Sequence, residues 1–157
     1  MNQNEVLKEN KDHIVTSPVF KMRKKVFLSD PILGMEKQQE YRKTITEICE
    51  KVGFNVINPW LREKRLYKRE KKCWWKETSA SEFVKRDLDD AKRCNIMVVF
   101  MPILSAGTCM ELFYAKSKGK KIIVFSNIEH LSPWIIYHSD AIVRNNEELE
   151  DKLRELI

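Results

Sequence analysis

Two acidic residues, Asp87 and Glu111, are the side chains of this sequence best placed to do chemistry. Glu111 follows an apolar run rich in β-branched residues and a short loop with one glycine. In α/β proteins, ligands bind at the loops that leave the carboxyl ends of the strands. Asp87 lies on the preceding helix, and we expect it at the same rim. Two carboxylates at neighbouring strand ends are typical of chemistry at the anomeric carbon of a sugar.

Each acid also has a purely structural interpretation. The pattern Thr108-x-x-Glu111 has the spacing of a capping box, in which the glutamate only bonds the backbone at a helix start. Asp87 is one of several acids, with Asp89 and Asp90, on a charged helix face that solvent would cover. From the residues alone, the capping-box interpretation of Glu111 is favoured.

The elements that must position these acids alternate between strands and helices. Apolar runs predict five strands and amphipathic periodicity predicts the helices between them. The strands are expected at 25–29, 54–57, 96–101, 122–125 and 141–143, and the helices from 36, from 79, at 108–118 and at 146–156. Near-continuous apolar strands belong to a parallel sheet that is covered on both faces. We therefore predict a flavodoxin-like, doubly wound α/β fold with strand order 2-1-3-4-5.

The whole chain has the composition of an ordinary globular domain, with 43% hydrophobic and 33% charged residues among 157. No apolar run is long enough to span a membrane, and the polar N-terminus is unlike a signal peptide. The cysteines form no C-x-x-C pair and the histidines share no metal-ligand spacing. These patterns predict a cytoplasmic protein without a metal site or disulfides.

Two stretches lie outside the predicted sheet. Residues 1–23 show little periodicity and predict a flexible N-terminal arm, which leaves 24–157 as the folded domain. Residues 61–77 form a basic insertion, with eight Lys and Arg against three Glu, and hold most of the net charge of +6. Its interleaved aromatic residues would suit nucleic acid or a phosphorylated ligand. A solvated, partly helical insertion is favoured over a nucleic-acid interface.

The motif around the two acids resembles the nucleoside 2-deoxyribosyltransferase family. A helix over 83–95 carries Asp87, a strand follows, and a loop of small residues leads into Gly107-x-x-x-Glu111-Leu-x-x-Ala. The likeness runs from about residue 24 to 156. It implies an enzyme that acts on the N-glycosidic bonds of 2′-deoxyribonucleosides and needs no metal or other cofactor.

The resemblance assigns a role to each acid. Glu111 matches the family's nucleophile, which attacks C1′ of the sugar and forms a covalent deoxyribosyl-enzyme. Asp87 matches the aspartate that holds the base and handles its proton. The helix N-terminus is expected to keep Glu111 ionised. The implied partners are a deoxyribonucleoside or deoxyribonucleotide, a free nucleobase and, because family members are oligomeric, further copies of the chain.

The resemblance also indicates residues around the substrate. Phe27 stands where family members usually have a tyrosine that hydrogen-bonds the nucleophile, and Asp30 stands where a small residue is usual. Ser105 stands where nucleoside-specific enzymes tend to have an acid, and where 2′-deoxynucleoside 5′-monophosphate N-glycosidases tend to have serine. The other expected substrate-binding residues are Gly107, Asn58 and Trp60, with Trp60 as a stacking wall for the base.

Three functions stay open at this point. The first is a nucleoside 2-deoxyribosyltransferase-like enzyme. The second is a 2′-deoxynucleoside 5′-monophosphate N-hydrolase, which Ser105 favours, although the arginine in the first loop of those hydrolases is missing from residues 29–36. The third is a catalytically weak domain that binds nucleotides as a sensor, which Phe27 and Asp30 favour.

Overall fold

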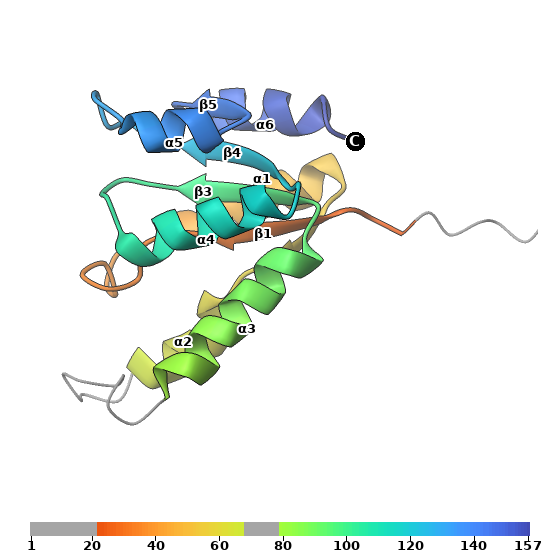
Figure 1. Ribbon diagram of the computed structural model, residues 1–157. Coiled ribbons are helices and arrows are strands. Elements are labelled where there is room, and N and C mark those ends of the chain that lie inside the picture. The colour runs from red at the N-terminus through yellow and green to blue at the C-terminus, as the bar shows by residue number, and fades with distance from the viewer. Residues whose placement is uncertain (1–21, 68–78) are drawn as a thin grey trace, which may run out of the picture.

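The computed structural model describes residues 22–67 and 79–157, which form one parallel sheet between two layers of helices (Figure 1). The strands are β1 (Lys25–Ser29), β2 (Asn55–Ile57), β3 (Ile96–Phe100), β4 (Lys121–Phe125) and β5 (Ala141–Val143). Every neighbouring pair is parallel and the order is β2-β1-β3-β4-β5. The predicted fold class and strand order are confirmed. The arm over 1–23, except its last two residues, and residues 68–77 of the basic insertion lie outside the described residues.

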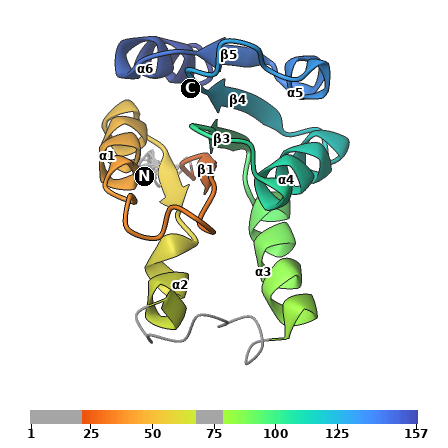
Figure 2. The same cartoon turned by 90° about the vertical axis from the view of Figure 1, so that its left-hand side faces the viewer.

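Helices cover both faces of the sheet. They are α1 (Tyr41–Val52), α2 (Trp60–Tyr67), α3 (Ala80–Arg93), α4 (Ala106–Ser117), α5 (Pro133–His138) and α6 (Asn146–Arg154). Helices α1 and α6 share one apolar core with the sheet, and α3, α4 and α5 share the other. Helices α2 and α3 project together past the β2 edge (Figure 2). Within the described ranges, no helix has the length and apolarity to cross a membrane.

Strand β1 shows how the alternation of side chains builds these layers. Val26 and Leu28 point into the core shared with α1 and α6, whereas Phe27 points into the core shared with α4. Successive residues of a strand face opposite sides. Ser29 therefore faces the same side as Phe27, and it does so where β1 ends. A buried hydroxyl is thus placed beside α4, at the carboxyl edge of the sheet.

A glycine ends helix α1, and helices α1 and α4 begin at residues other than those predicted. Gly53 ends α1 with φ 111°, a left-handed conformation that favours glycine, and its N–H donates to the carbonyls of Cys49 and Glu50. Helix α1 begins at Tyr41, later than the predicted residue 36. Helix α4 begins at Ala106, two residues earlier than predicted, with Ser105 as its N-cap residue. That second shift changes the interpretation of Glu111.

Candidate active site

A cavity of about 360 Å³ lies where the carboxyl ends of β1 and β3 meet the start of α4. This place is the switch point of the strand order, where α/β proteins bind ligands. Asp87 and Glu111 both line the cavity, together with other residues expected around the substrate, which are Asp30, Ser105 and Gly107. The structure therefore brings the two acids to one site.

Glu111 lies in the second turn of α4 and is bonded to β1. The Ser29 hydroxyl donates a 2.5 Å hydrogen bond to Glu111 Oε2. Thr108 lies inside the helix, not at its cap, and its buried hydroxyl has no hydrogen-bond partner among the described residues. A capping box would need Thr108 at the N-cap position. The capping-box interpretation of Glu111 is therefore wrong.

The surroundings of Glu111 set its ionisation. Burial raises the pKa of Glu111 to about 7, the Ser29 hydrogen bond opposes this rise, and the negative charge of Asp87 adds to it. The field of a helix N-terminus fades beyond the first turn. The expectation that the helix terminus holds Glu111 ionised is therefore corrected. Glu111 therefore loses its proton at a higher pH than an exposed glutamate does.

Ser29 was missed by the sequence analysis. Phe27 has no exposed surface, packs in the core and lines neither this cavity nor its larger neighbour. The hydroxyl that contacts Glu111 comes instead from Ser29, two residues further along the same face of β1. The available signal was a serine at the end of an otherwise apolar strand, where a polar side chain needs a buried partner.

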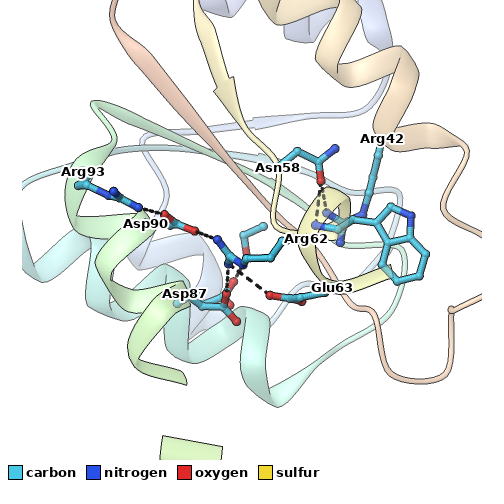
Figure 3. Close-up of polar contacts among 10 residues, drawn as sticks. Arg42, Asn58, Arg62, Glu63, Asp87, Asp90 and Arg93 are labelled. Carbon is cyan, nitrogen blue, oxygen red and sulfur yellow. Dashed lines mark hydrogen bonds and ion pairs between the residues drawn. The ribbon is translucent and has the colours of Figure 1, made fainter. Parts of the chain in front are cut away.

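Asp87 belongs to a charged cluster between α2 and α3, which we call the Arg62 cluster (Figure 3). Arg62 Nη2 lies 3.1 Å from Asp87 Oδ1 and 3.4 Å from Glu63 Oε1. Arg62 Nη1 donates a 2.8 Å hydrogen bond to Asp90 Oδ2, and Arg93 also pairs with Asp90. A single guanidinium therefore joins three acids from two helices.

The Arg62 cluster corrects the expectation for the acids of α3. Asp90 is 1% exposed and Asp87 is 5% exposed, so neither is a solvated surface acid. In the described part of the insertion, Leu61 and Arg62 are exposed and Glu63 is fully buried, so this part is helical and turns one acid inward. The signal in the sequence was the i, i+3 spacing of Asp87 and Asp90, which puts both acids on one helix face.

The pKa of Asp87 is raised in this environment. Burial is the main cause, while the hydrogen bond with Glu63 and the positive charges of Arg62 and Arg86 act in the opposite direction. An acid whose pKa is raised keeps its proton to a higher pH than an exposed aspartate does. Such a group is suited to give a proton to a leaving group.

Arg42 organises the other expected substrate residues. This buried guanidinium pairs with Asp30, donates a 2.5 Å hydrogen bond to Gln39 Oε1 and a 2.9 Å hydrogen bond to Asn58 Oδ1, and lies 5.9 Å from the centre of a Trp60 ring. Asn58 and Trp60 line neither cavity. Asp30 lines the cavity, but its charge is matched by Arg42. These residues fix the loops after β1 and β2.

A larger cavity of about 790 Å³ adjoins the first and also reaches Asp87 and Glu111. It is a groove between α3, α4 and α5. Its walls include large apolar side chains that are exposed, namely Val84, Leu104, Met110, Phe113 and Trp134. Across residues 22–67 and 79–157, no three His, Cys, Asp or Glu side chains are grouped so that they could hold a metal ion.

Comparison with known proteins agrees with this architecture. A family model described as nucleoside 2-deoxyribosyltransferase matches residues 26–151. The chain is similar to the 2-deoxyribosyltransferase of the psychrotolerant bacterium Bacillus psychrosaccharolyticus, with TM-score 0.64 and 20% identity over 81% of this chain and 90% of that one. It is also similar to the CMP N-glycosidase of Clostridium botulinum, with TM-score 0.55 and 24% identity over 85% of this chain and 100% of that one.

A third similar structure is a conserved protein of Enterococcus faecalis, with TM-score 0.65 and 11% identity over 86% of this chain and 99% of that one. At these identities the three structures show a shared fold. A search of curated proteins finds no match.

Proposed function

Because the chain belongs to the nucleoside 2-deoxyribosyltransferase family, we propose that it cleaves or transfers the N-glycosidic bond of 2′-deoxyribonucleosides. The reaction passes through a covalent bond between Glu111 and C1′ of the sugar. The observation that carries this proposal is the 360 Å³ cavity that both Asp87 and Glu111 line. A retaining transfer at an anomeric carbon needs one carboxylate as nucleophile and a second group that handles the proton.

Each acid acts in both halves of the reaction. In the first half, the ionised Glu111 attacks C1′, the bond to the base breaks, and a proton from the site of Asp87 neutralises the departing base. In the second half, water or an acceptor base attacks C1′, gives its proton back to that site, and releases Glu111. Ser29 holds the Glu111 carboxylate in one orientation through its 2.5 Å hydrogen bond.

The sensor alternative has less support. It rested partly on Phe27, where the hydroxyl that contacts the nucleophile is lacking. Ser29 provides a hydroxyl to Glu111 from the same strand face, and Asp30 is paired with Arg42. The hydroxyl that Phe27 lacks is thus supplied by Ser29, and the charge of Asp30 is neutralised by Arg42. Both contacts favour a catalytically active site.

Removal of the nucleophile tests the proposal. Purified protein is incubated with deoxyribonucleosides and a free acceptor base, and the products are separated by chromatography. We expect Glu111→Ala to abolish turnover and the deoxyribosyl adduct seen by mass spectrometry of the intact protein, because the barrier rises by several kcal/mol without a nucleophile. Glu47→Ala, an exposed change on α1, should behave as the wild type. Full activity in Glu111→Ala would contradict the covalent route.

A second candidate activity, the hydrolysis of deoxynucleoside 5′-monophosphates, is favoured by the start of α4. Ser105, Gly107 and Thr108 line the cavity there. The first N–H groups of a helix have no intrahelical acceptor and attract anions. The buried Thr108 hydroxyl also has no hydrogen-bond partner among the described residues. These donors suit a phosphate, whereas Arg62, from the basic insertion, is already paired with acids.

Substitution of Ser105 tests the charge of the substrate. Ser105→Asp places a negative charge beside the α4 donors, so a phosphate would be repelled and an uncharged 5′-hydroxyl accepted. We expect the preference to shift toward unphosphorylated nucleosides by about 1–3 kcal/mol, the scale of a charged hydrogen bond. The measurement is kcat/KM for a deoxynucleoside and for its 5′-monophosphate. Asn55→Asp, exposed at the opposite end of the sheet, is the control, and an unchanged ratio in Ser105→Asp would rule out a phosphate at this position.

We also propose that the chain forms a homo-oligomer through the groove between α3, α4 and α5. Several large apolar side chains are exposed there, and such patches mark interaction surfaces. Since the groove also reaches Asp87 and Glu111, a second copy seated in it would close one side of the site.

A further inference from the structure

Glu63 is a buried acid that the proposed reaction has not yet used. It has no exposed surface, it lines the 360 Å³ cavity, and it points toward Asp87 from α2 (Figure 3). Glu63 Oε1 faces Arg62, whereas Oε2 is buried and no donor among the described residues reaches it. Burial of an unpaired carboxylate oxygen is costly. A proton on one of the two carboxyls removes this cost, because Glu63 then hydrogen-bonds Asp87.

The charges around Glu63 favour such a proton. On α3, Asp87 and Asp90 face the same guanidinium as Glu63, so Arg62 is shared among three acids. Two carboxyls in contact cannot both ionise at ordinary cost, and they titrate as one unit. Burial, with the adjacent charge of Asp87, raises the pKa of Glu63 to about 8, although Arg62 acts against this rise.

The remaining charged groups lie further around the pair. Arg86 on α3 acts on Asp87, Arg93 pairs with Asp90, and Arg42 on α1 acts on Glu111. Glu111 on α4 in turn experiences the negative charge of Asp87. Each of these cations thus influences a different acid, and among the described residues Arg62 is the cation that contacts both members of the pair.

We propose that Glu63 shares one proton with Asp87 and that this pair, instead of Asp87 alone, supplies the proton to the departing base. This inference rests on the proposed function. As the bond between C1′ and the base nitrogen breaks, its electrons stay on the base and the shared proton moves from Asp87 to the base. Glu63 and Asp87 are then both ionised beside Arg62. The attacking water or acceptor base later returns one proton to the pair. Glu63 is thus a positioning residue that acts through Asp87.

Two measurements test the shared proton. The first is infrared spectroscopy of the purified protein between pH 6 and pH 9, which detects the C=O stretch of a protonated carboxyl and needs no activity. Glu111 contributes a band that is lost with a midpoint of about 7, so the spectra are recorded in a Glu111→Gln background. There we expect a band that disappears with a midpoint of about 8, and that is missing when Glu63→Gln is added. The second is the pH profile of kcat/KM for a deoxynucleoside. Glu63→Gln keeps the size and the hydrogen bond to Asp87 but not the acid, so the alkaline limb should move at least one pH unit lower.

Two further variants make the outcome decisive. Glu63→Asp keeps an acid and should restore the alkaline limb, whereas Glu82→Gln, an exposed change in the first turn of α3, should match the wild type in both measurements. An unchanged limb in Glu63→Gln, or a carboxyl band with a midpoint near 8 that persists when Glu63→Gln is added to Glu111→Gln, would overturn the proposal. If the wild type turns over no deoxyribonucleoside or deoxyribonucleotide, the proposed function fails, and the infrared band still decides whether the pair holds a proton.

Discussion

Ser29 decides how Glu111 is oriented and how firmly it holds its proton. Its hydroxyl donates the 2.5 Å hydrogen bond that favours the ionised carboxylate, against the rise in pKa that burial causes. Only the ionised form of Glu111 can attack C1′. The rate of the proposed reaction should therefore rise with pH through about 7, where Glu111 loses its proton.

Removal of the Ser29 hydroxyl tests this control. In Ser29→Ala the ionised form of Glu111 loses a donor, so its pKa rises further and the acid limb of the pH–rate profile moves to higher pH. We expect kcat/KM at pH 7 to fall about 10- to 100-fold, the scale of a charged hydrogen bond. Ser126, which follows β4, has a similarly buried hydroxyl that donates to the Met101 carbonyl after β3. The acid limb should not move in Ser126→Ala. An unmoved limb in Ser29→Ala would show that Ser29 does not tune Glu111.

At the residue scale, the sequence predicted which residues line the site better than it predicted which side chains contact one another. The residues around Glu111 and Asp87 could be found because a strand, a loop and a helix carry them in a recognisable spacing. Ser29 could not be found in this way, because a serine at the end of a strand has the same sequence pattern whether its hydroxyl contacts a carboxylate or water. Thr108 misled for a related reason, since the helix begins at Ala106 and capping-box spacing alone does not locate a helix start.

At the scale of elements, α2 and α3 hold the proton-handling side of the site. Arg62 links them through Asp87, Asp90 and Glu63. If Arg62 is removed, these acids stay buried without their shared cation. We expect Arg62→Met to lower the free energy of unfolding by about 1–3 kcal/mol, less than for a wholly buried pair because the Arg62 side chain is 38% exposed.

The decrease in the free energy of unfolding caused by Arg62→Met should also depend on pH. Arg62 lowers the pKa of Glu63 and of Asp87, so both pKa values rise without it. A raised pKa in the folded state means that stability is lost as pH increases toward that pKa. Urea unfolding should therefore show a larger decrease in stability at pH 8 than at pH 5.

Arg93 provides the control, because its side chain is 65% exposed and pairs with Asp90. Arg93→Met should lower the free energy of unfolding by at most about 1 kcal/mol. Equal losses in the two variants would argue against the central place of Arg62.

The sequence predicted helix α3 correctly but only part of the face that it buries. The helical spacing of Val84, Leu88 and Ala91 indicates a core face, and Ala91 is fully buried in the core. Val84 is 46% exposed, however, whereas Asp87 and Asp90 are buried. Apolar spacing identifies a helix face that avoids water, and it does not say whether the sheet, a groove or another chain covers that face. The partner that lets the acids be buried, Arg62, comes from a segment whose overall charge indicated a solvated surface.

At the scale of the whole molecule, the alternation of apolar strands with amphipathic helices was sufficient to predict the sheet and its order. Handedness and strand polarity restrict such a pattern to few topologies. The same reasoning could not predict the groove between α3, α4 and α5. It arises from exposed apolar side chains on separate helices, and their common surface exists only after the helices pack on the sheet.

The exposed groove makes the oligomeric state the property of the whole molecule that is most open to test. Trp134 and Met110 are 75% and 68% exposed on it, which is costly for a lone chain and favourable if a second copy covers them. We expect the wild type to sediment as an oligomer.

Trp134→Glu puts a charge into the covered surface, so it should raise the dissociation constant at least about 100-fold, since burial of an unpaired charge costs several kcal/mol. Ile157→Glu, also exposed but at the C-terminus, should leave the assembly intact. If the copies close the site, turnover should fall with dissociation in Trp134→Glu alone, and a wild type that sediments as a monomer at micromolar concentration would refute the proposed assembly.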